Sequence, residues 1–294
     1  MPCVGDDDGR NEGARTARYY GGIWCPFFGF ERLNYSDSYD RTAMKTKVND
    51  IELYYEQYGE GEPIIFSHGW LDDCSLWNSQ IRLFAENHMV ISYDHRGHGR
   101  SDKPRNDYSV ETLSNDLRSF VQMLKLEKVN LVGFSLGGMA ALMFTLQHPA
   151  EVSKLVLVGT TAKMPLSMHI LEALWRMLPY QTVVKMISKY KFYKPTQQTI
   201  SENISRAMHV PKYAAYKCLQ EFTRNYDIRN RVSEIKAPTL IIVGEKDRIN
   251  MEASKLLNRD IEGSRLRIIS GCGHSVMIEK AEEFNQIVRQ FIDE

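Results

Sequence analysis

The sequence predicts an α/β fold in which a mostly parallel sheet is flanked by helices and carries an inserted helical cap. Three observations support this fold class. Short apolar runs bounded by turn residues alternate with segments of helical periodicity, as in sheets that are covered on both faces. A glycine-rich turn joins one of these runs directly to a helix. The alternation stops between residues 161 and 233, where only helical patterns occur, and it then resumes.

The predicted strands are short, and most of them are continuous apolar runs. A run of this length between turn residues is typical of a strand that is buried on both faces. They cover residues 51–58, 63–67, 89–93, 129–132, 154–158, 239–243 and 266–269. Apolar residues recur at helical spacing in residues 109–124, 136–147 and 281–292.

Four helices are predicted in the segment that interrupts the alternation. Prolines separate them, and they cover residues 167–178, 180–190, 197–208 and 212–224. Because the sheet pattern resumes at Pro238, we interpret residues 161–233 as a cap over the strand ends. Residues 44–160 and 234–294 then form the core. A separate helical domain with its own role is the alternative.

Residues 1–43 differ from the rest of the chain. They are rich in glycine, and their apolar residues follow neither the helical nor the strand period. We interpret them as an N-terminal extension that is flexible or lies outside the core, so that the folded domain begins at Met44. The alternative is an ordered arm that docks through its aromatic side chains, Tyr19, Trp24, Phe27 and Phe28.

Composition excludes several classes of partner and cofactor. Lys plus Arg and Asp plus Glu both total 37, so the net charge of zero favours neither a nucleic acid nor an anionic membrane as partner. No apolar run approaches the roughly 20 residues of a membrane-spanning helix. The five cysteines form no C-x-x-C pair, which argues against a zinc site and a disulfide framework. We therefore expect a cytoplasmic protein without a metal or an organic cofactor; the oligomeric state is not predicted.

The candidate nucleophile is Ser135, at the centre of the segment GFSLG at residues 133–137. This segment matches the pattern G-x-S-x-G and lies between an apolar strand and a helix, where a sharp turn exposes the serine. The flanking glycines avoid collisions with the turning chain. The helix N-terminus favours negative charge that develops at the serine. The alternative is a glycine-rich turn whose serine only caps the helix.

A serine hydroxyl needs a base, and the base needs an orienting acid. His274 lies in the segment GCGHS at residues 271–275, between the last predicted strand and the last helix. The glycines suggest a loop that brings the imidazole over the strand ends, so we expect His274 to be the base. Asp247 follows the preceding strand and completes the chain order Ser, Asp, His. Glu245 is the competing carboxylate, and we favour Asp247.

Backbone N–H groups are the expected donors to a developing oxyanion. Leu136, directly after the candidate nucleophile, supplies one of them. The second is expected from Trp70, because Gly69 lets the loop after residues 63–67 bend towards the serine. We interpret His68 as a residue that braces this loop.

Together these residues resemble the α/β-hydrolase superfamily from Met44 to the C-terminus. The landmarks are HGW at residues 68–70, DHRGHGRSD at 94–102, the Ser135 turn, and Asp247 with His274. The second landmark resembles a structural loop of the family. Within the superfamily the chain looks similar to bacterial aryl esterases and cofactor-free haloperoxidases. The peroxidase-type members of that group carry proline where this chain has Leu71, which favours ester hydrolysis.

The resemblance implies an α/β-hydrolase fold and a serine carboxylesterase that acts on a small-molecule ester, short-chain or aryl. Hydrolysis of an enol-lactone or of a carbon–carbon bond is the alternative, because the same three residues serve all three reactions. A non-catalytic ligand-binding protein on the same scaffold is the alternative of another class.

Overall fold

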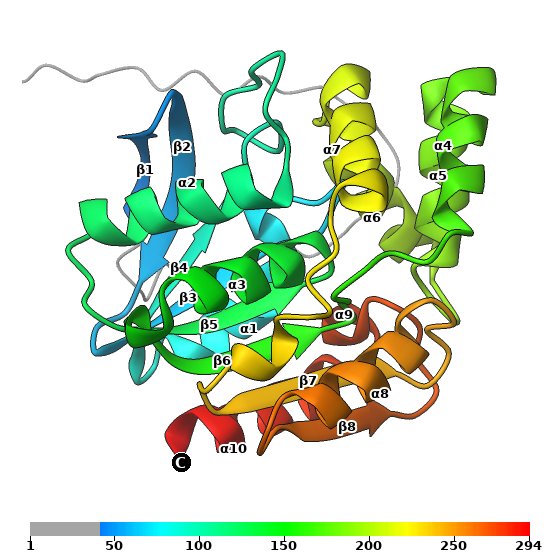
Figure 1. The fold of residues 1–294 in the computed structure, drawn as a ribbon. Coiled ribbons are helices and arrows are strands. Elements are labelled where there is room, and N and C mark those ends of the chain that lie inside the picture. The colour runs from blue at the N-terminus through cyan, green and yellow to red at the C-terminus, as the bar shows by residue number, and fades with distance from the viewer. Residues whose placement is uncertain (1–41) are drawn as a thin grey trace, which may run out of the picture. The chain divides into compact units, whose positions relative to one another are not determined.

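A single eight-stranded sheet forms the centre of the computed structural model, which describes residues 42–294 (Figure 1). The strands lie in the order β1-β2-β4-β3-β5-β6-β7-β8. Their bounds are β1 Thr42–Val48, β2 Ile51–Tyr58, β3 Glu62–Ser67, β4 His88–Tyr93, β5 Val129–Phe134, β6 Val152–Val158, β7 Thr239–Gly244 and β8 Arg265–Ile269.

The strands from β4 to β8 along the sheet pair in parallel, and only the β1–β2 and β2–β4 pairs are antiparallel. All six residues of β5 and of β7 are buried, as expected for parallel strands that are covered on both faces. The carboxyl ends of β3, β5, β7 and β8 meet at one edge of the sheet, and the loops that follow them carry the predicted site residues.

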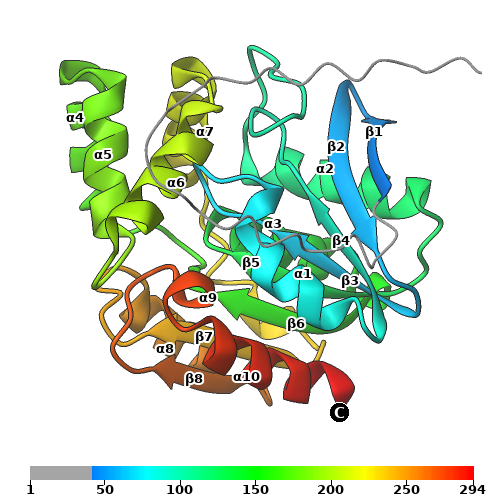
Figure 2. The same ribbon diagram turned by 180° about the vertical axis from the view of Figure 1, so that it is seen from behind.

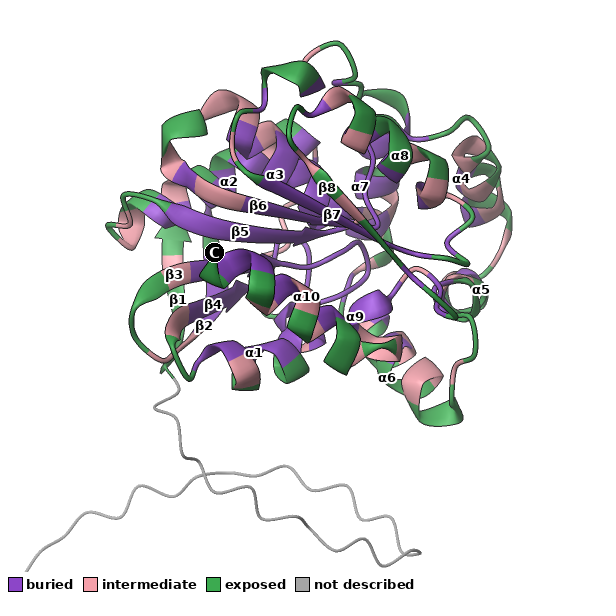
Figure 3. Cartoon of the chain, turned by 90° about the horizontal axis from the view of Figure 1, so that it is seen from below, coloured by how far each residue is buried: buried purple, intermediate pink, exposed green. Residues whose placement is uncertain are grey.

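Helices cover both faces of the sheet (Figures 2 and 3). The helices α2, α3 and α8 lie on one face, and α1, α9 and α10 lie on the other. The hydrophobic core is accordingly divided into two clusters, one on each side of the sheet. The bounds are α1 Asn78–Phe84, α2 Val110–Met123, α3 Leu136–Gln147, α8 Asn250–Asp260, α9 Val276–Glu279 and α10 Ala281–Asp293.

Four helices between β6 and β7 form the cap. They are α4 Met168–Met177, α5 Tyr180–Tyr190, α6 Gln197–Met208 and α7 Lys212–Arg224. All four lie where the sequence predicts helices, with ends that agree within one residue. The prolines that separate the predicted helices all lie just before them, because proline is not tolerated in a helix interior.

The fold class predicted from the sequence is confirmed, and the differences concern element ends and a few elements that the sequence analysis did not recognise. The first strand contains Met44 but begins two residues earlier, at Thr42, and the sequence did not single it out as a strand. Helices α1, α8 and α9 were also not predicted. The interpretation of residues 1–43 as an extension falls almost wholly outside the described residues, which begin at Thr42.

Candidate active site

Ser135 lies at a sharp turn between β5 and α3. Its backbone has φ of 51° and ψ of −114°, a conformation that an L-residue adopts only under strain. Its backbone N–H donates to the carbonyl oxygen of Val158, and Met139 donates to its carbonyl oxygen. Bonds to both sides of the peptide therefore hold the strained residue in place.

The glycines around Ser135 are required by close contacts. A Cβ atom at Gly133 would lie 2.7 Å from the Cα of Gly138, and one at Gly137 would lie 2.3 Å from the carbonyl oxygen of Ser67. Both distances are too short for any other residue type. The first turn of α3 therefore packs directly against the carboxyl end of β3, as the G-x-S-x-G pattern predicts.

His274 and Asp247 come together from the loops after β8 and β7. The Nδ1 atom of His274 lies 2.6 Å from Oδ2 of Asp247, whose side chain is buried. Burial alone would raise the pKa of Asp247, but the charge of His274 and hydrogen bonds from His274 and Asn250 outweigh it. The pKa of Asp247 is therefore held below its ordinary value, and this carboxylate stays ionised.

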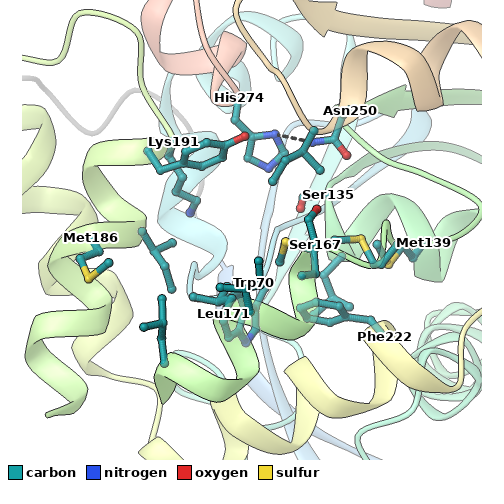
Figure 4. Close-up of a pocket in the computed structure, with 18 residues that line it drawn as sticks. Trp70, Ser135, Met139, Ser167, Leu171, Met186, Lys191, Phe222, Asn250 and His274 are labelled. Carbon is teal, nitrogen blue, oxygen red and sulfur yellow. Dashed lines mark hydrogen bonds between the residues drawn. The ribbon is translucent and has the colours of Figure 1, made fainter. Parts of the chain in front are cut away.

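Asn250 is a site residue that the sequence analysis missed. Its side-chain amide donates to both oxygens of Asp247, at 3.1 and 2.9 Å, and its nitrogen lies 3.2 Å from His274 Nδ1 (Figure 4). Its backbone N–H also donates to Asp247. One signal in the sequence could have indicated it. Asp247 lies three residues before the start of helix α8, and a side-chain acceptor just before a helix commonly binds the backbone N–H groups of its first turn.

Glu245 lies apart from this pair. Its side chain is exposed and binds Lys246 Nζ and the backbone N–H of Gly271. These bonds shape the turn that precedes His274, but they do not bring the Glu245 carboxylate to the imidazole. The structure therefore pairs His274 with Asp247, the carboxylate that the sequence analysis favoured.

The proposed oxyanion donors, Trp70 and Leu136, line the same cavity as Ser135. Gly69 lets the loop before Trp70 approach the Phe134 ring closely, because a Cβ atom at position 69 would lie 2.8 Å from that ring. The indole of Trp70 donates to the carbonyl oxygen of Ala215 on α7, which ties this loop to the cap. Leu71 follows with a φ of 62°.

His68 and the loop that begins at Asp94 are structural, as the sequence analysis expected. His68 is fully buried, and its Nε2 accepts a hydrogen bond from the backbone N–H of His95. The carboxylate of Asp94 accepts from the backbone N–H groups of Cys74 and Arg100, each at 2.7 Å. These bonds brace the loops beneath the cavity and leave none of these side chains at its wall.

Lys191, between α5 and α6, connects the cap to two loops of the site. Its carbonyl oxygen accepts from the backbone N–H groups of His274 and Ser275, and its Nζ lies 2.6 Å from Oδ2 of Asp72. Burial lowers the pKa of Lys191. Asp72 is also buried, but the charges of Lys191 and Arg206 keep its pKa below the ordinary value. The pair is therefore an ion pair inside the protein.

The cavity over Ser135 has a volume of about 430 Å³ and lies between the strand ends and the cap (Figure 4). Side chains of α4, α5 and α7 form its outer wall. Most of the residues that line the cavity are apolar, and the basic side chains among them are Lys191 and His274. The lining residues from the cap include Met164, Leu171, Leu174, Met186, Ile187 and Phe222.

Within residues 42–294 no cluster of three or more His, Cys, Asp or Glu side chains has the geometry of a metal site. In the same part of the chain, every helix is too short or too polar to cross a bilayer. Cys74, Cys218 and Cys272 are free and buried, whereas Cys3 and Cys25 lie outside the described residues.

Comparison with known proteins identifies the family. Residues 62–183 match the family model described as the alpha/beta hydrolase fold. The chain is 30% identical over 273 residues to the AB hydrolase superfamily protein YisY of Bacillus subtilis, a match that covers 84% of this chain and 97% of the relative. The protein therefore belongs to the α/β-hydrolase superfamily, and the resemblance noted in the sequence is confirmed.

Relatives with more specific names differ in the reactions that those names state. A 2-hydroxy-6-oxononadienedioate/2-hydroxy-6-oxononatrienedioate hydrolase of Klebsiella pneumoniae is 32% identical, over 82% of this chain and 91% of the relative. An esterase from Exiguobacterium antarcticum has a similar structure, with a TM-score of 0.81 and 25% identity over 86% of this chain and the whole of that one. These likenesses support a hydrolase and leave the scissile bond open.

Proposed function

We propose that this protein is a carboxylesterase-type serine hydrolase that cleaves small neutral esters, short-chain or aryl, through an acyl-enzyme on Ser135. The observation that carries the proposal is the 2.6 Å contact between His274 and Asp247 at the cavity that Ser135 also lines. A serine, a histidine and a buried carboxylate around one cavity are the parts that acyl transfer requires.

The proposed reaction starts at the Ser135 hydroxyl. His274 accepts its proton through Nε2 while Oγ attacks the ester carbonyl carbon, and the imidazolium then protonates the departing alcohol. Asp247 holds Nδ1–H, so that Nε2 is the basic nitrogen, and its charge stabilises the imidazolium. A water molecule activated by His274 then attacks the acyl-enzyme and releases the acid and Ser135.

The negative oxygen of each tetrahedral intermediate needs donors. We assign this role to the backbone N–H groups of Trp70 and Leu136, which are fixed by the close packing of α3 on β3. Donors that are already oriented stabilise charge without reorganisation during the reaction. The N-terminus of α3 adds its dipole at the same place.

The charge of the cavity favours a neutral substrate. The Klebsiella pneumoniae relative is named for dienedioate and trienedioate substrates, which carry two carboxylates. Among the residues that line the cavity here, Lys191 is the one permanent cation, and it already pairs with Asp72. A dicarboxylate would enter this apolar cavity without a free cation to replace its hydration, which is costly.

The backbone at Leu71 supports hydrolysis over peracid formation. Proline fixes φ near −65°, whereas Leu71 has φ of 62°. This loop therefore has a shape that a proline at position 71 would not allow.

Cleavage of an enol-lactone or of a carbon–carbon bond is the second candidate function, since relatives with such specificity would use the same three side chains.

A non-catalytic binding protein is the remaining alternative. The pairing of His274 with the buried Asp247 at the cavity that Ser135 lines argues against it, because these are the parts that acyl transfer requires.

The test measures how fast the purified protein turns over three classes of substrate, two of them neutral and one anionic. The panel contains an aryl acetate, a small lactone and a 2-hydroxy-6-oxodienoate, with the Ser135→Ala variant as control for contamination. We expect the aryl acetate to be turned over fastest and the variant to be inactive. Faster turnover of the dienoate would replace the ester assignment, and no turnover of any substrate would favour a binding protein.

A further inference from the structure

Exposed apolar side chains concentrate on the cap. Of the ten large hydrophobic residues that are exposed within residues 42–294, six lie between positions 166 and 193, on or beside α4 and α5. These six are Leu166, Ile170, Met177, Met186, Tyr190 and Tyr193. Such clustering marks an interaction surface, because single exposed hydrophobic residues are normally scattered over a protein.

The cluster surrounds the mouth of the active-site cavity. Ile170, Met186 and Tyr190 line the cavity and are nevertheless 65%, 46% and 49% exposed, so they form its rim. Leu166 and Met177, which are 78% and 79% exposed, extend the apolar surface away from the rim along α4. Ile170 and Met177 are seven residues apart, which places them on one side of the helix, two turns from each other.

The charge of this surface is positive. Between positions 163 and 194 the chain contains six basic residues and one acidic residue. The acidic residue, Glu172, is buried and bound by Arg224. Among the basic residues only Lys191 is buried. Of the exposed ones, Lys163 is paired with Asp227 and Arg176 with Glu172, and the others are Lys185, Lys189 and Lys194. Lys185 and Lys189 lie one turn apart on α5, beside Met186 and Tyr190 of the rim.

We propose that this surface, here called the α4–α5 face and defined by Leu166, Ile170, Met177, Met186, Tyr190 and the neighbouring lysines, docks on an anionic lipid surface. Exposed apolar side chains beside basic ones are the combination that binds the boundary between lipid headgroups and acyl chains. Figure 1 shows α4 and α5 side by side at one end of the molecule. Both helices can therefore approach a flat surface together.

A second copy of the chain fits this face less well. In a two-fold symmetric contact the same patch is present on both sides, so Lys185, Lys189 and Lys194 of one copy would lie in one interface with the same three lysines of the other. Such like-charge contacts oppose association. Anionic headgroups instead neutralise these cations while the apolar side chains enter the lipid. The net charge of zero, which argued against a membrane partner, does not describe this local distribution.

Docking would open the cavity mouth onto lipid. Small neutral esters of the kind assigned under the proposed function partition into bilayers, and the enzyme would take them from there. The uptake of substrate rests on the proposed function, whereas the docking does not. The two can therefore fail separately.

The experiment measures binding of the full chain to vesicles of phosphatidylcholine, with and without one quarter phosphatidylglycerol. The variant Leu166→Ser/Met177→Ser removes two apolar side chains that neither line the cavity nor are buried. The matched control is Leu256→Ser/Ile268→Ser, which changes two exposed hydrophobic residues elsewhere. We expect binding to the anionic vesicles to weaken at least about tenfold in the first variant, from the apolar area removed, and to persist in the control.

The charge is tested with Lys185→Glu/Lys189→Glu. Each basic residue near an anionic surface contributes measurably to binding, so we expect this reversal to weaken binding to the anionic vesicles about tenfold or more and to reduce its salt dependence. Turnover of a water-soluble aryl acetate should stay unchanged in both α4–α5 variants, while turnover of an ester dissolved in the vesicles should fall with binding.

Three results would overturn the docking proposal. They are no vesicle binding by the wild-type chain, equal losses in the α4–α5 variants and the control, and conversion of a dimer to a monomer by Leu166→Ser/Met177→Ser in light scattering. If soluble esters are hydrolysed without vesicle binding, the docking is wrong and the proposed function stands. If the chain binds vesicles but hydrolyses no ester, the proposed function is wrong and the docking stands.

Discussion

Two carboxylates two residues apart follow β7, and their surroundings give them different parts. Asp247 is buried against His274 and receives hydrogen bonds from Asn250, whereas Glu245 is exposed and binds Lys246. In the low dielectric of the buried position, the charge of Asp247 acts strongly on the imidazole. The spacing after the strand did not separate them, because both side chains can reach the same end of the sheet.

We therefore expect Asp247→Asn to lower kcat by about 10³ to 10⁴, because the amide no longer orients the imidazole or stabilises its cation. Glu245→Gln, the matched control, should stay within about twofold, since an exposed ion pair contributes little. Steady-state kinetics on an aryl acetate gives both values. A larger loss in Glu245→Gln would move the acid to position 245.

The buried histidines under the site make stability depend on pH. Burial lowers the pKa of His98 to about 3 and that of His95 well below its ordinary value, so both are neutral in the folded protein. In the unfolded chain each binds a proton near pH 6.5. The unfolded state therefore binds more protons as the pH falls below about 6.5, and folding stability decreases in that direction.

Between pH 7 and pH 5 we expect each of these histidines to reduce the free energy of unfolding by about 2 kcal/mol. His98→Asn keeps a side-chain donor for the carbonyl oxygen of Arg96 and should remove about half of the two-histidine effect. Urea unfolding at both pH values measures this; equal pH slopes in wild type and His98→Asn would contradict it.

At the scale of elements, the cap is joined to the site by a buried ion pair. Lys191 holds the loop of His274 through its carbonyl oxygen and the loop after Trp70 through Asp72. Asn203 and Arg206 of α6 also contact Asp72, at 3.2 and 3.5 Å. The cap therefore contacts the loops that carry His274 and Trp70, in addition to covering the cavity.

Removing Lys191 should consequently affect both stability and catalysis. We expect Lys191→Met to destabilise the protein by about 3 kcal/mol or more, because the buried carboxylate of Asp72 would lose the cation that pairs with it. It should lower kcat more than it changes KM, and Lys191→Arg should restore part of kcat. Thermal unfolding and steady-state kinetics check these expectations.

The matched control is the exposed pair Lys163–Asp227, which joins the beginning and the end of the cap. Lys163→Met should cost less than about 1 kcal/mol and leave kcat unchanged. If Lys163→Met and Lys191→Met had the same effect on kcat, the inference that Lys191 positions the loops of His274 and Trp70 would be wrong.

The sequence was most informative where one residue type is required. The four cap helices followed from apolar spacing and bounding prolines, and the Ser135 turn followed from its glycines. Helix α8 was missed because its buried residues are few, namely Asn250, Ser254 and Leu257, so its apolar period is weak. Asn250 was missed with it. The contact of Lys191 with Asp72 joins residues 119 positions apart, and no local pattern encodes it.

At the scale of the whole molecule, sheet topology assembles the site. Trp70, Ser135, Asp247 and His274 follow β3, β5, β7 and β8, whose parallel pairing through β6 places all four carboxyl ends at one edge. The alternation of strands and helices predicted a parallel sheet, and the carboxyl ends of parallel strands lie at the same edge. The cap covers the site, and the α4–α5 face adds an exposed apolar and basic surface beside it within residues 42–294.

The central claim is covalent catalysis by Ser135, and the most direct measurement is trapping of the acyl-enzyme. The protein is mixed with an excess of an aryl acetate, quenched in acid within the first turnover and digested for mass spectrometry. We predict a burst of the released phenol and one acetyl group on the peptide that contains Ser135, with neither in Ser135→Ala. Acetylation at another residue, or unchanged turnover by Ser135→Ala, would contradict this account.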